Sequence, residues 1–209
     1  MRHPRTTPLG FDELLSRVRD LPPGYLGQIC GGELFISEAP SPARAHAMAE
    51  IMATLVAGSP LGDPPPEGWH ILGNAEIAAG SERLLVADVA GWLLDNNPGA
   101  DDGSLPIRTP PTWICEVVGG GPRAFTLTTK RAIYAEIGVQ YLWIVDPDSQ
   151  VLEVFQNQRG KWLLIAALAE ERTAAVIPFQ SSRFDAGELW IKDRRTSKTP
   201  NPPSARHRM

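Results

Sequence analysis

The chain has 209 residues, of which 43% are hydrophobic and 21% are charged, a composition typical of a globular protein. This length suits one domain with a proper core and is short for two. No run of about eighteen apolar residues occurs, which argues against a membrane-spanning helix, and the N-terminal residues lack the apolar stretch of a secretion signal. The two cysteines, Cys30 and Cys115, match no CxxC or zinc spacing. We therefore expect a reduced, cytoplasmic protein.

Charge is divided unevenly along the chain. Residues 192–209 contain six of the 20 basic and one of the 24 acidic residues, so the remainder has 14 basic against 23 acidic residues and a net charge of −9. Such an acidic body repels polyanions at long range, which argues against tight nonspecific binding of nucleic acid. We expect a flexible N-terminus over 1–10, one domain over 11–191, and a disordered basic tail over 192–209 that has almost no apolar side chains.

Helices and short strands alternate in the first half of the chain. Helices are predicted where apolar residues recur at helical spacing, and strands where short apolar runs lie between glycine- and proline-rich turns. Serine followed by proline is typical of a helix N-terminus. In order, we expect a helix over Phe11–Arg19, a hairpin over 25–29 and 33–37, a helix from Ser41 to about Ala57, and strands over 69–72, 75–78 and 83–89.

The second half contains a strand, a glycine-rich loop, a helix and another strand in succession. The first strand covers Thr112–Val118, the helix covers Phe125–Ile137 and ends at Gly138, and the second strand covers Tyr141–Val145. Such a unit favours a parallel strand pair with a right-handed crossover. Residues 93–111 are too irregular for a core element. Two or three antiparallel strands are expected, over 151–156, 161–168 and roughly 173–177, and a small closing helix over 184–191. The prediction is an α/β fold with a mixed central sheet flanked by helices.

Glu116 is the one charged residue in the otherwise uncharged strand TWICEVV. Strand alternation puts Glu116 on one face together with Ile114, and Cys115 on the opposite face. Burying an unpaired carboxylate costs several kcal/mol, so Glu116 needs a cation, a hydrogen-bond donor or a proton. The alternative is a glutamate at the sheet edge that pairs with an arginine.

Asp88 repeats this pattern, because it is a lone acid within the apolar run LLVADVAGW. Taken alone, it is also compatible with a turn or cap aspartate. Two such carboxylates on adjacent strands, however, make a site of hard oxygen ligands that suits Mg²⁺. The backbone carbonyl of Val117 is a candidate for a third protein ligand.

Lys130 and Tyr134 stand four residues apart on the predicted helix and therefore share one face. Ile133 and Ile137 lie nearby, so this face turns partly toward the core. A lysine there is able to reach the carboxylates, where it would orient the attacking water or stabilise a pentavalent phosphate. The alternative is a surface lysine whose ammonium group stays in water.

A known family resembles this arrangement over nearly the whole chain. The segment from Glu116 through Lys130 to Tyr134, followed by GVQYLWIVDP over 138–147, resembles the Uma family of restriction endonucleases in the PD-(D/E)XK nuclease superfamily. Asp88 stands for the aspartate motif and Glu116-Val117 for the second motif. The resemblance implies a restriction-endonuclease-like fold that covers about residues 11–191.

The resemblance also implies a function for these residues. Asp88, Glu116 and Lys130 would be catalytic, with Mg²⁺ or Mn²⁺ held by the two carboxylates and Val117. The superfamily lysine, two residues after the glutamate, is replaced by Val118 here, so Lys130 from the helix would substitute for it. The implied substrate is nucleic acid, in the first place DNA, and the implied assembly is a homodimer.

Three positions depart from the family pattern. Gln28 stands where a glutamate is usual, Thr126 where an aspartate is common, and Gly119 in place of a serine. Loss of two acids weakens the support around a metal. A weakly active or inactive binding or assembly module therefore stays open as the alternative function. If the site is active, Gln28 and Tyr134 are expected as supporting residues.

The glycine-rich loop after the strand carries Arg123, which is a candidate for contact with a substrate phosphate because loop amides and a helix N-terminus favour anions. The alternative is an exposed loop arginine. This loop lacks the GxxxxGK[ST] pattern of a nucleotide-binding loop. His46, on the alanine-rich second helix, is expected to pack rather than to bind a metal. A dimer interface is expected at Tyr141–Trp143 or at the proline-rich loops.

Overall fold

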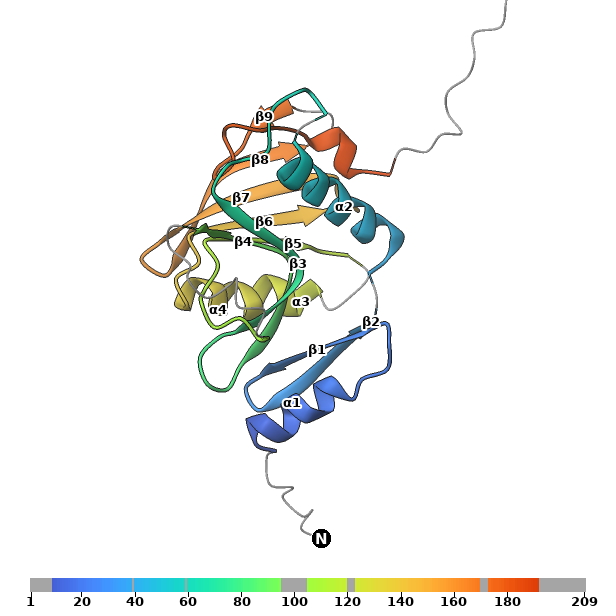
Figure 1. Cartoon of the computed structure of the whole chain (residues 1–209), viewed down its shortest axis with the longest axis vertical. Coiled ribbons are helices and arrows are strands. Elements are labelled where there is room, and N and C mark those ends of the chain that lie inside the picture. The colour runs from blue at the N-terminus through green and yellow to red at the C-terminus, as the bar shows by residue number, and fades with distance from the viewer. Residues whose placement is uncertain are drawn as a thin grey trace, which may run out of the picture.

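A mixed sheet of eight strands, counted over the described residues, forms the centre of the fold (Figure 1). Its strand order is β2-β1-β4-β5-β6-β7-β8, and β3 pairs with β4 outside this path. Among the strand pairs of the described residues, β5 and β6 run parallel, as the strand–loop–helix–strand pattern predicts, and the other pairs are antiparallel. The strands are β1 (Tyr25–Cys30), β2 (Glu33–Glu38), β3 (Trp69–Ala78), β4 (Leu84–Leu93), β5 (Trp113–Val117), β6 (Tyr141–Asp146), β7 (Val151–Gln158) and β8 (Lys161–Ala169).

The structure is a computed structural model that describes residues 9–38, 40–58, 60–94, 105–119, 123–169 and 173–191. The expected basic tail, nearly all of the expected flexible N-terminus and most of the glycine-rich loop lie outside these residues. Within the described part, no helix is long and apolar enough to cross a membrane.

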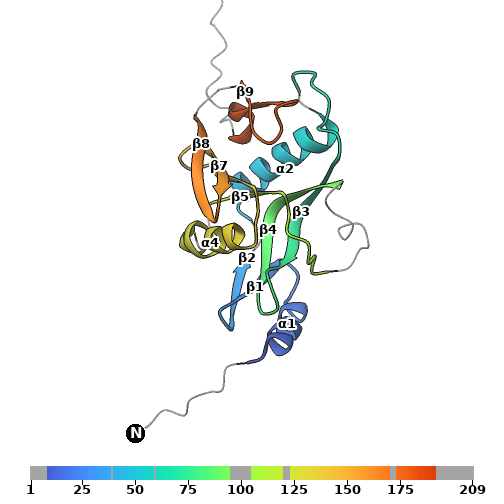
Figure 2. The ribbon, with the colours of Figure 1, turned by 90° about the vertical axis from the view of Figure 1, so that its left-hand side faces the viewer.

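Helices cover both faces of the sheet. Figures 1 and 2 show α2 (Pro42–Ala57) on one side and α4 (Arg131–Glu136) on the other. The helix α1 (Phe11–Arg19) packs on the β1–β2 hairpin at one end of the molecule. The α4 side also includes the short helix α3 (Arg123–Phe125) and the π-helical turn η2 (Thr126–Lys130), which leads directly into α4.

Strand β5 separates two hydrophobic cores, and its alternation is as predicted. Trp113, Cys115 and Val117 pack in the core beneath α2. Ile114 and Val118 pack in the core beneath α4. Because every side chain of β5 is buried, Glu116 has no route to bulk water along its own strand.

Four predicted elements, three strands and one helix, differ from the structure. The two short strands predicted over 69–72 and 75–78 form one strand, β3. Asn74 between them takes a positive φ of 50°, but pairing with β4 continues on both sides of it. The third antiparallel strand predicted after β8 instead pairs as β9 (Thr173–Ala175) with β10 (Arg183–Asp185) in a separate small sheet. The closing helix is reduced to the 3₁₀ turn η3 (Ala186–Leu189) after β10.

The expected interface at Tyr141–Trp143 is wrong. These residues belong to β6, which lies inside the sheet between β5 and β7. Leu142 and Trp143 are completely buried. An interior strand already has both of its hydrogen-bonding edges paired, so it cannot offer an edge to a second subunit.

Strand β4 opens a fork in the sheet. It pairs with β5 only over Val89–Gly91 and with β1 only at Leu84, while β3 follows almost its full length. The backbone of residues 85–88 therefore faces a gap between β1 and β5. Polar side chains from three other elements converge there.

Candidate active site

Two side chains satisfy the backbone of Val86 inside the fork. The Val86 amide donates to Gln28 Oε1 at 3.1 Å, and its carbonyl accepts from Lys130 Nζ at 2.7 Å. Buried backbone groups require such partners. Gln28, on β1, thus contacts the strand that carries Asp88.

Glu116 is enclosed by the helical segment on its own face of the sheet. Lys130 Nζ lies 2.6 Å from Oε1 and 2.7 Å from Oε2 of Glu116, and the Tyr134 hydroxyl donates to Oε1 at 2.7 Å. All three residues are at most 2% exposed. The structure thus brings together three predicted site residues, and the alternatives of a surface lysine and an edge glutamate paired with arginine are wrong.

Burial and charge act against each other at Glu116. Burial raises the pKa of the Glu116 carboxyl, the nearby Lys130 ammonium lowers it, and the Asp88 carboxylate raises it. The net effect is a raised pKa. Burial, reinforced by the Glu116 charge and hydrogen bond, raises the pKa of Tyr134 far above its ordinary value, so its hydroxyl stays protonated as a donor.

A π-helical turn determines where Lys130 points. In a regular α-helix, Phe125 and Ile133 would be about 80° apart around the axis, because eight residues turn by about 100° each. The turn over Thr126–Lys130 winds less per residue, and both Phe125 and Ile133 contribute to the core beneath α4. Lys130 ends this turn and lies over Glu116. Such turns occur frequently at functional sites.

Asp88 is held by a residue that the sequence did not predict. Arg44 donates to both Asp88 oxygens, from Nη2 to Oδ1 and from Nε to Oδ2 at 3.3 Å. Oδ2 also accepts the Val117 amide at 2.7 Å, which connects Asp88 to β5 next to Glu116. Asp88 is only 2% exposed. A turn or cap role for Asp88 is therefore wrong.

Arg44 left one signal in the sequence. It lies in the first turn of α2, where the partial positive charge of the helix N-terminus disfavours a cation. An arginine in that position indicates a specific acidic partner elsewhere in the fold. The remainder of α2 is rich in alanine and gave no direction for that partner.

The site has ligands of the kind that a magnesium ion requires. Asp88 and Glu116 supply carboxylate oxygens. Val118 donates its amide to β6, and Val117 donates to Asp88, so the carbonyl of Val117 turns toward β4 as its amide does. Mg²⁺ commonly takes one or two carboxylates and completes its octahedron with water. Among the described residues, no group of three or more His, Cys, Asp or Glu is placed to hold a metal. The donor set fits Mg²⁺ in kind.

Arg123 lies at the edge of this region and is paired. Its guanidinium is 2.6 Å from Asp146 Oδ2 at the end of β6, and half of the side chain is exposed. Burial acts to raise the pKa of Asp146, but hydrogen bonds from Arg123 and Ser149 outweigh it, so the net pKa is lowered. The structure thus gives Arg123 an anchored position, and contact with a phosphate stays a prediction.

Two other residues take structural positions. His46 lies with Nε2 2.9 Å from the Glu188 carbonyl, so it joins α2 to η3, as expected for a packed histidine. Cys115 faces the core beneath α2, and burial, together with the nearby Asp88 and Glu116 carboxylates, raises its pKa well above the ordinary value. A thiol in this protonated state is a poor nucleophile.

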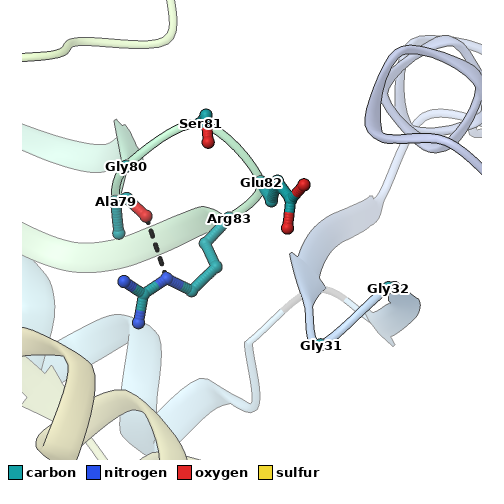
Figure 3. Close-up of a pocket in the computed structure, with 7 residues that line it drawn as sticks. All are labelled: Gly31, Gly32, Ala79, Gly80, Ser81, Glu82 and Arg83. Atoms are coloured by element: carbon teal, nitrogen blue, oxygen red, sulfur yellow. Dashed lines mark hydrogen bonds between the residues drawn. The ribbon is translucent and has the colours of Figure 1, made fainter.

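A cavity of about 390 Å³ lies elsewhere, between the hairpin turn at Gly31-Gly32 and the turn over 79–83 (Figure 3). Its lining includes none of the residues that contact Asp88 or Glu116. Arg83 is the basic residue of this lining, and it is held by the Ala79 carbonyl at 2.9 Å and by Glu136. The carboxylate site is therefore separate from this cavity.

Comparison with known proteins identifies the family. A family model described as "Putative restriction endonuclease" matches residues 13–185. The chain belongs to the Uma2 family. This assignment confirms the resemblance in the motifs around Glu116 and Lys130, and at family level it supports a nuclease function.

A solved structure agrees with the fold. The crystal structure of "a putative nuclease belonging to DUF820 from Anabaena variabilis" has a TM-score of 0.63, with 19% identity, over 87% of this chain and 97% of that one. At this identity the likeness shows the fold, which is the predicted mixed sheet flanked by helices. No curated protein matches the sequence.

Proposed function

We propose that the chain is a divalent-metal-dependent nuclease that hydrolyses phosphodiester bonds of nucleic acid, in the first place DNA. The observation that carries this proposal is the convergence of Glu116, Lys130 and Tyr134 beside Asp88 in a buried fork of the sheet. Buried ionisable groups with perturbed pKa values are typical of functional sites. Membership in the Uma2 family supports the same reaction class.

Asp88, Glu116 and the Val117 carbonyl would hold Mg²⁺ or Mn²⁺. When bound, such an ion supplies a Lewis acid for the phosphate and lowers the pKa of a bound water. The charges of two carboxylates are equal and opposite to that of the ion, which favours its binding in a buried site where water stabilises charge poorly.

Lys130 and its neighbours would perform the remaining tasks. Lys130 is fixed by three short contacts, to Val86 and to both Glu116 oxygens, so its ammonium has a defined direction for orienting the attacking water or the scissile phosphate. Tyr134 holds Glu116 as a protonated donor. Gln28 fixes the backbone next to Asp88. Arg123 would contact a neighbouring phosphate of the substrate.

Glu116→Gln tests the metal site directly. Calorimetric titration of the full chain with Mg²⁺ and Mn²⁺ should show binding to the wild type and its loss in the variant, because an amide is a weak ligand for hard cations. Glu76→Gln is the matched control, since Glu76 pairs with Arg19 outside the site. The same proteins should be assayed for cleavage of DNA and RNA. Absence of metal binding by the wild type would end this proposal.

A binding or assembly module without turnover is the second candidate function. The observation that favours it is charge balance, because Arg44 already satisfies Asp88 and Lys130 already satisfies Glu116. In that case nucleic acid binding would survive in Glu116→Gln and no cleavage would occur in either protein. We also propose a homodimer, in which two sites would address two strands. Sedimentation equilibrium measures that assembly.

A further inference from the structure

Arg44 covers the part of Asp88 that a metal ion would need. Its guanidinium donates to Oδ1 and to Oδ2, and Oδ2 accepts a further hydrogen bond from the Val117 amide. A carboxylate offers about four lone-pair directions in total. The three hydrogen bonds leave one direction, on Oδ1, and Arg44 already binds that oxygen. A bidentate arginine and an ion on the same carboxylate therefore compete at Oδ1.

The position of Arg44 makes its release feasible. Its side chain is 16% exposed, whereas that of Asp88 is 2% exposed, so part of the arginine side chain reaches solvent and the carboxylate does not. The Ser41 cap holds only the Arg44 amide, at 3.4 Å, and leaves the side chain unconstrained by the cap. The α2 N-terminus also repels a cation, which lowers the cost of moving the guanidinium outward.

Charge balance gives the same indication. Asp88 and Glu116 contribute two negative charges, and Arg44 and Lys130 contribute two positive charges. A divalent ion added to this neutral cluster would leave two uncompensated positive charges in a buried place, which is costly. Departure of Arg44 halves that excess. Lys130, at 2% exposure and with three contacts, is in no position to leave.

We propose that Arg44 is an exchangeable counterion, which occupies Asp88 in the metal-free protein and gives up this carboxylate when a divalent ion binds. This inference rests on the proposed metal-dependent function and adds a competition step to it. Arg44 is a positioning residue in this role. It keeps Asp88 paired and oriented until the ion arrives, and it lowers the apparent affinity for that ion.

The test is metal affinity rather than activity. Mn²⁺ titration of chelator-treated full-length wild type, Arg44→Gln and Arg19→Gln by calorimetry compares the three proteins under one condition. Removal of a charged, bidentate competitor should tighten the apparent Kd of Arg44→Gln by about tenfold or more. Arg19→Gln should match the wild type, because Arg19 forms an equally bidentate pair with Glu76 outside the site. An unchanged or weaker Kd in Arg44→Gln would overturn the inference.

Two further arms cover failure of folding and failure of the proposed function. If Arg44→Gln does not fold, Arg44→Lys takes its place, because it keeps the charge but lacks the planar, bidentate guanidinium. The Kd of Arg44→Lys for Mn²⁺ should still be tighter than that of the wild type, by a smaller factor than expected for Arg44→Gln. A Kd equal to the wild-type value would overturn the inference in that arm as well. Equal, measurable affinities in all proteins would remove the competition step alone. No Mn²⁺ binding by any protein would remove both the competition step and the metal-dependent function.

Discussion

The two acids of the site are held in contrasting ways by residues that come from the two faces of the sheet. On the α4 side, Glu116 is closed in by Lys130 and Tyr134, which are 2% and 0% exposed. On the α2 side, Asp88 is met by Arg44, which reaches solvent. One ion pair is part of the core, and the other is at its boundary.

The two ion pairs have different roles in this site. The enclosed pair fixes geometry, because a lysine with three short contacts has little freedom. The pair at the boundary keeps a place available for an incoming charge. Substitutions in the two ion pairs that have equal effects would contradict this division. The predictions below test it.

Lys130→Met should give the largest effect on stability. It leaves the buried Glu116 carboxylate without its cation, a loss of about 3–5 kcal/mol in the free energy of unfolding. Urea unfolding followed by tryptophan fluorescence measures it. Arg44→Gln is the comparison, and its loss should be smaller because water is able to reach the place of Arg44. Equal losses in the two variants would contradict the division between an enclosed pair and a pair at the core boundary.

The second-largest effect is expected in the pH dependence of the free energy of unfolding of Glu116→Gln. The pKa of Glu116 in the folded protein is raised above its ordinary value of 4.5. Between these two values the folded chain keeps a proton that the unfolded chain releases. The contribution of Glu116 to stability is thus fully present below about pH 4.5 and is lost as pH rises through the folded pKa.

Relative to wild type, the unfolding free energy of Glu116→Gln should therefore rise with pH in this window, by at most about 1.4 kcal/mol per pH unit. Urea titrations at several pH values give this slope. Glu136→Gln is the control of opposite sign. The hydrogen bond from Arg83 lowers the pKa of Glu136, so its contribution is present above the ordinary value and lost as pH falls. Slopes of the same sign would contradict the assignment.

Tyr134→Phe should give the smallest of these effects. It removes one donor from Glu116 Oε1 while Lys130 keeps both oxygens engaged, so the expected loss of unfolding free energy is about 1 kcal/mol. The pKa of Glu116 should rise further, because the Tyr134 hydrogen bond lowers it in the wild type. A repeat of the pH series in this variant should move the window upward, and an unmoved window would show that Tyr134 does not act on the charge of Glu116.

The sequence was informative where burial left a clear pattern. A single acid in each of two apolar strands predicted two buried carboxylates, and alternation assigned Glu116 and Cys115 to opposite faces of β5 correctly. Helix limits at Phe11 and Arg19 also matched, because proline and glycine follow closely. The direction of Lys130 came only from the family resemblance, since helical spacing alone left a solvent position open.

Contacts between elements distant in the chain were not predictable in the same way. Arg44 and Asp88 are 44 residues apart, and nothing in either segment specifies the angle at which α2 crosses the sheet. The separate pairing of β9 with β10 likewise depends on how the chain turns between them. The predicted strands over 69–72 and 75–78 left a gap at Asn74, and the left-handed conformation of Asn74 within β3 leaves no distinct sequence pattern.

The π-helical turn over Thr126–Lys130 makes the site depend on residue count as well as residue identity. It takes up the rotation that lets Phe125 and Ile133 reach one core while Lys130 lies over Glu116. A deletion of one residue in this turn would restore regular winding and carry the ammonium around the helix, with every motif residue still present. In relatives of this chain, spacing between the glutamate and the lysine is therefore as informative about function as the two residues themselves.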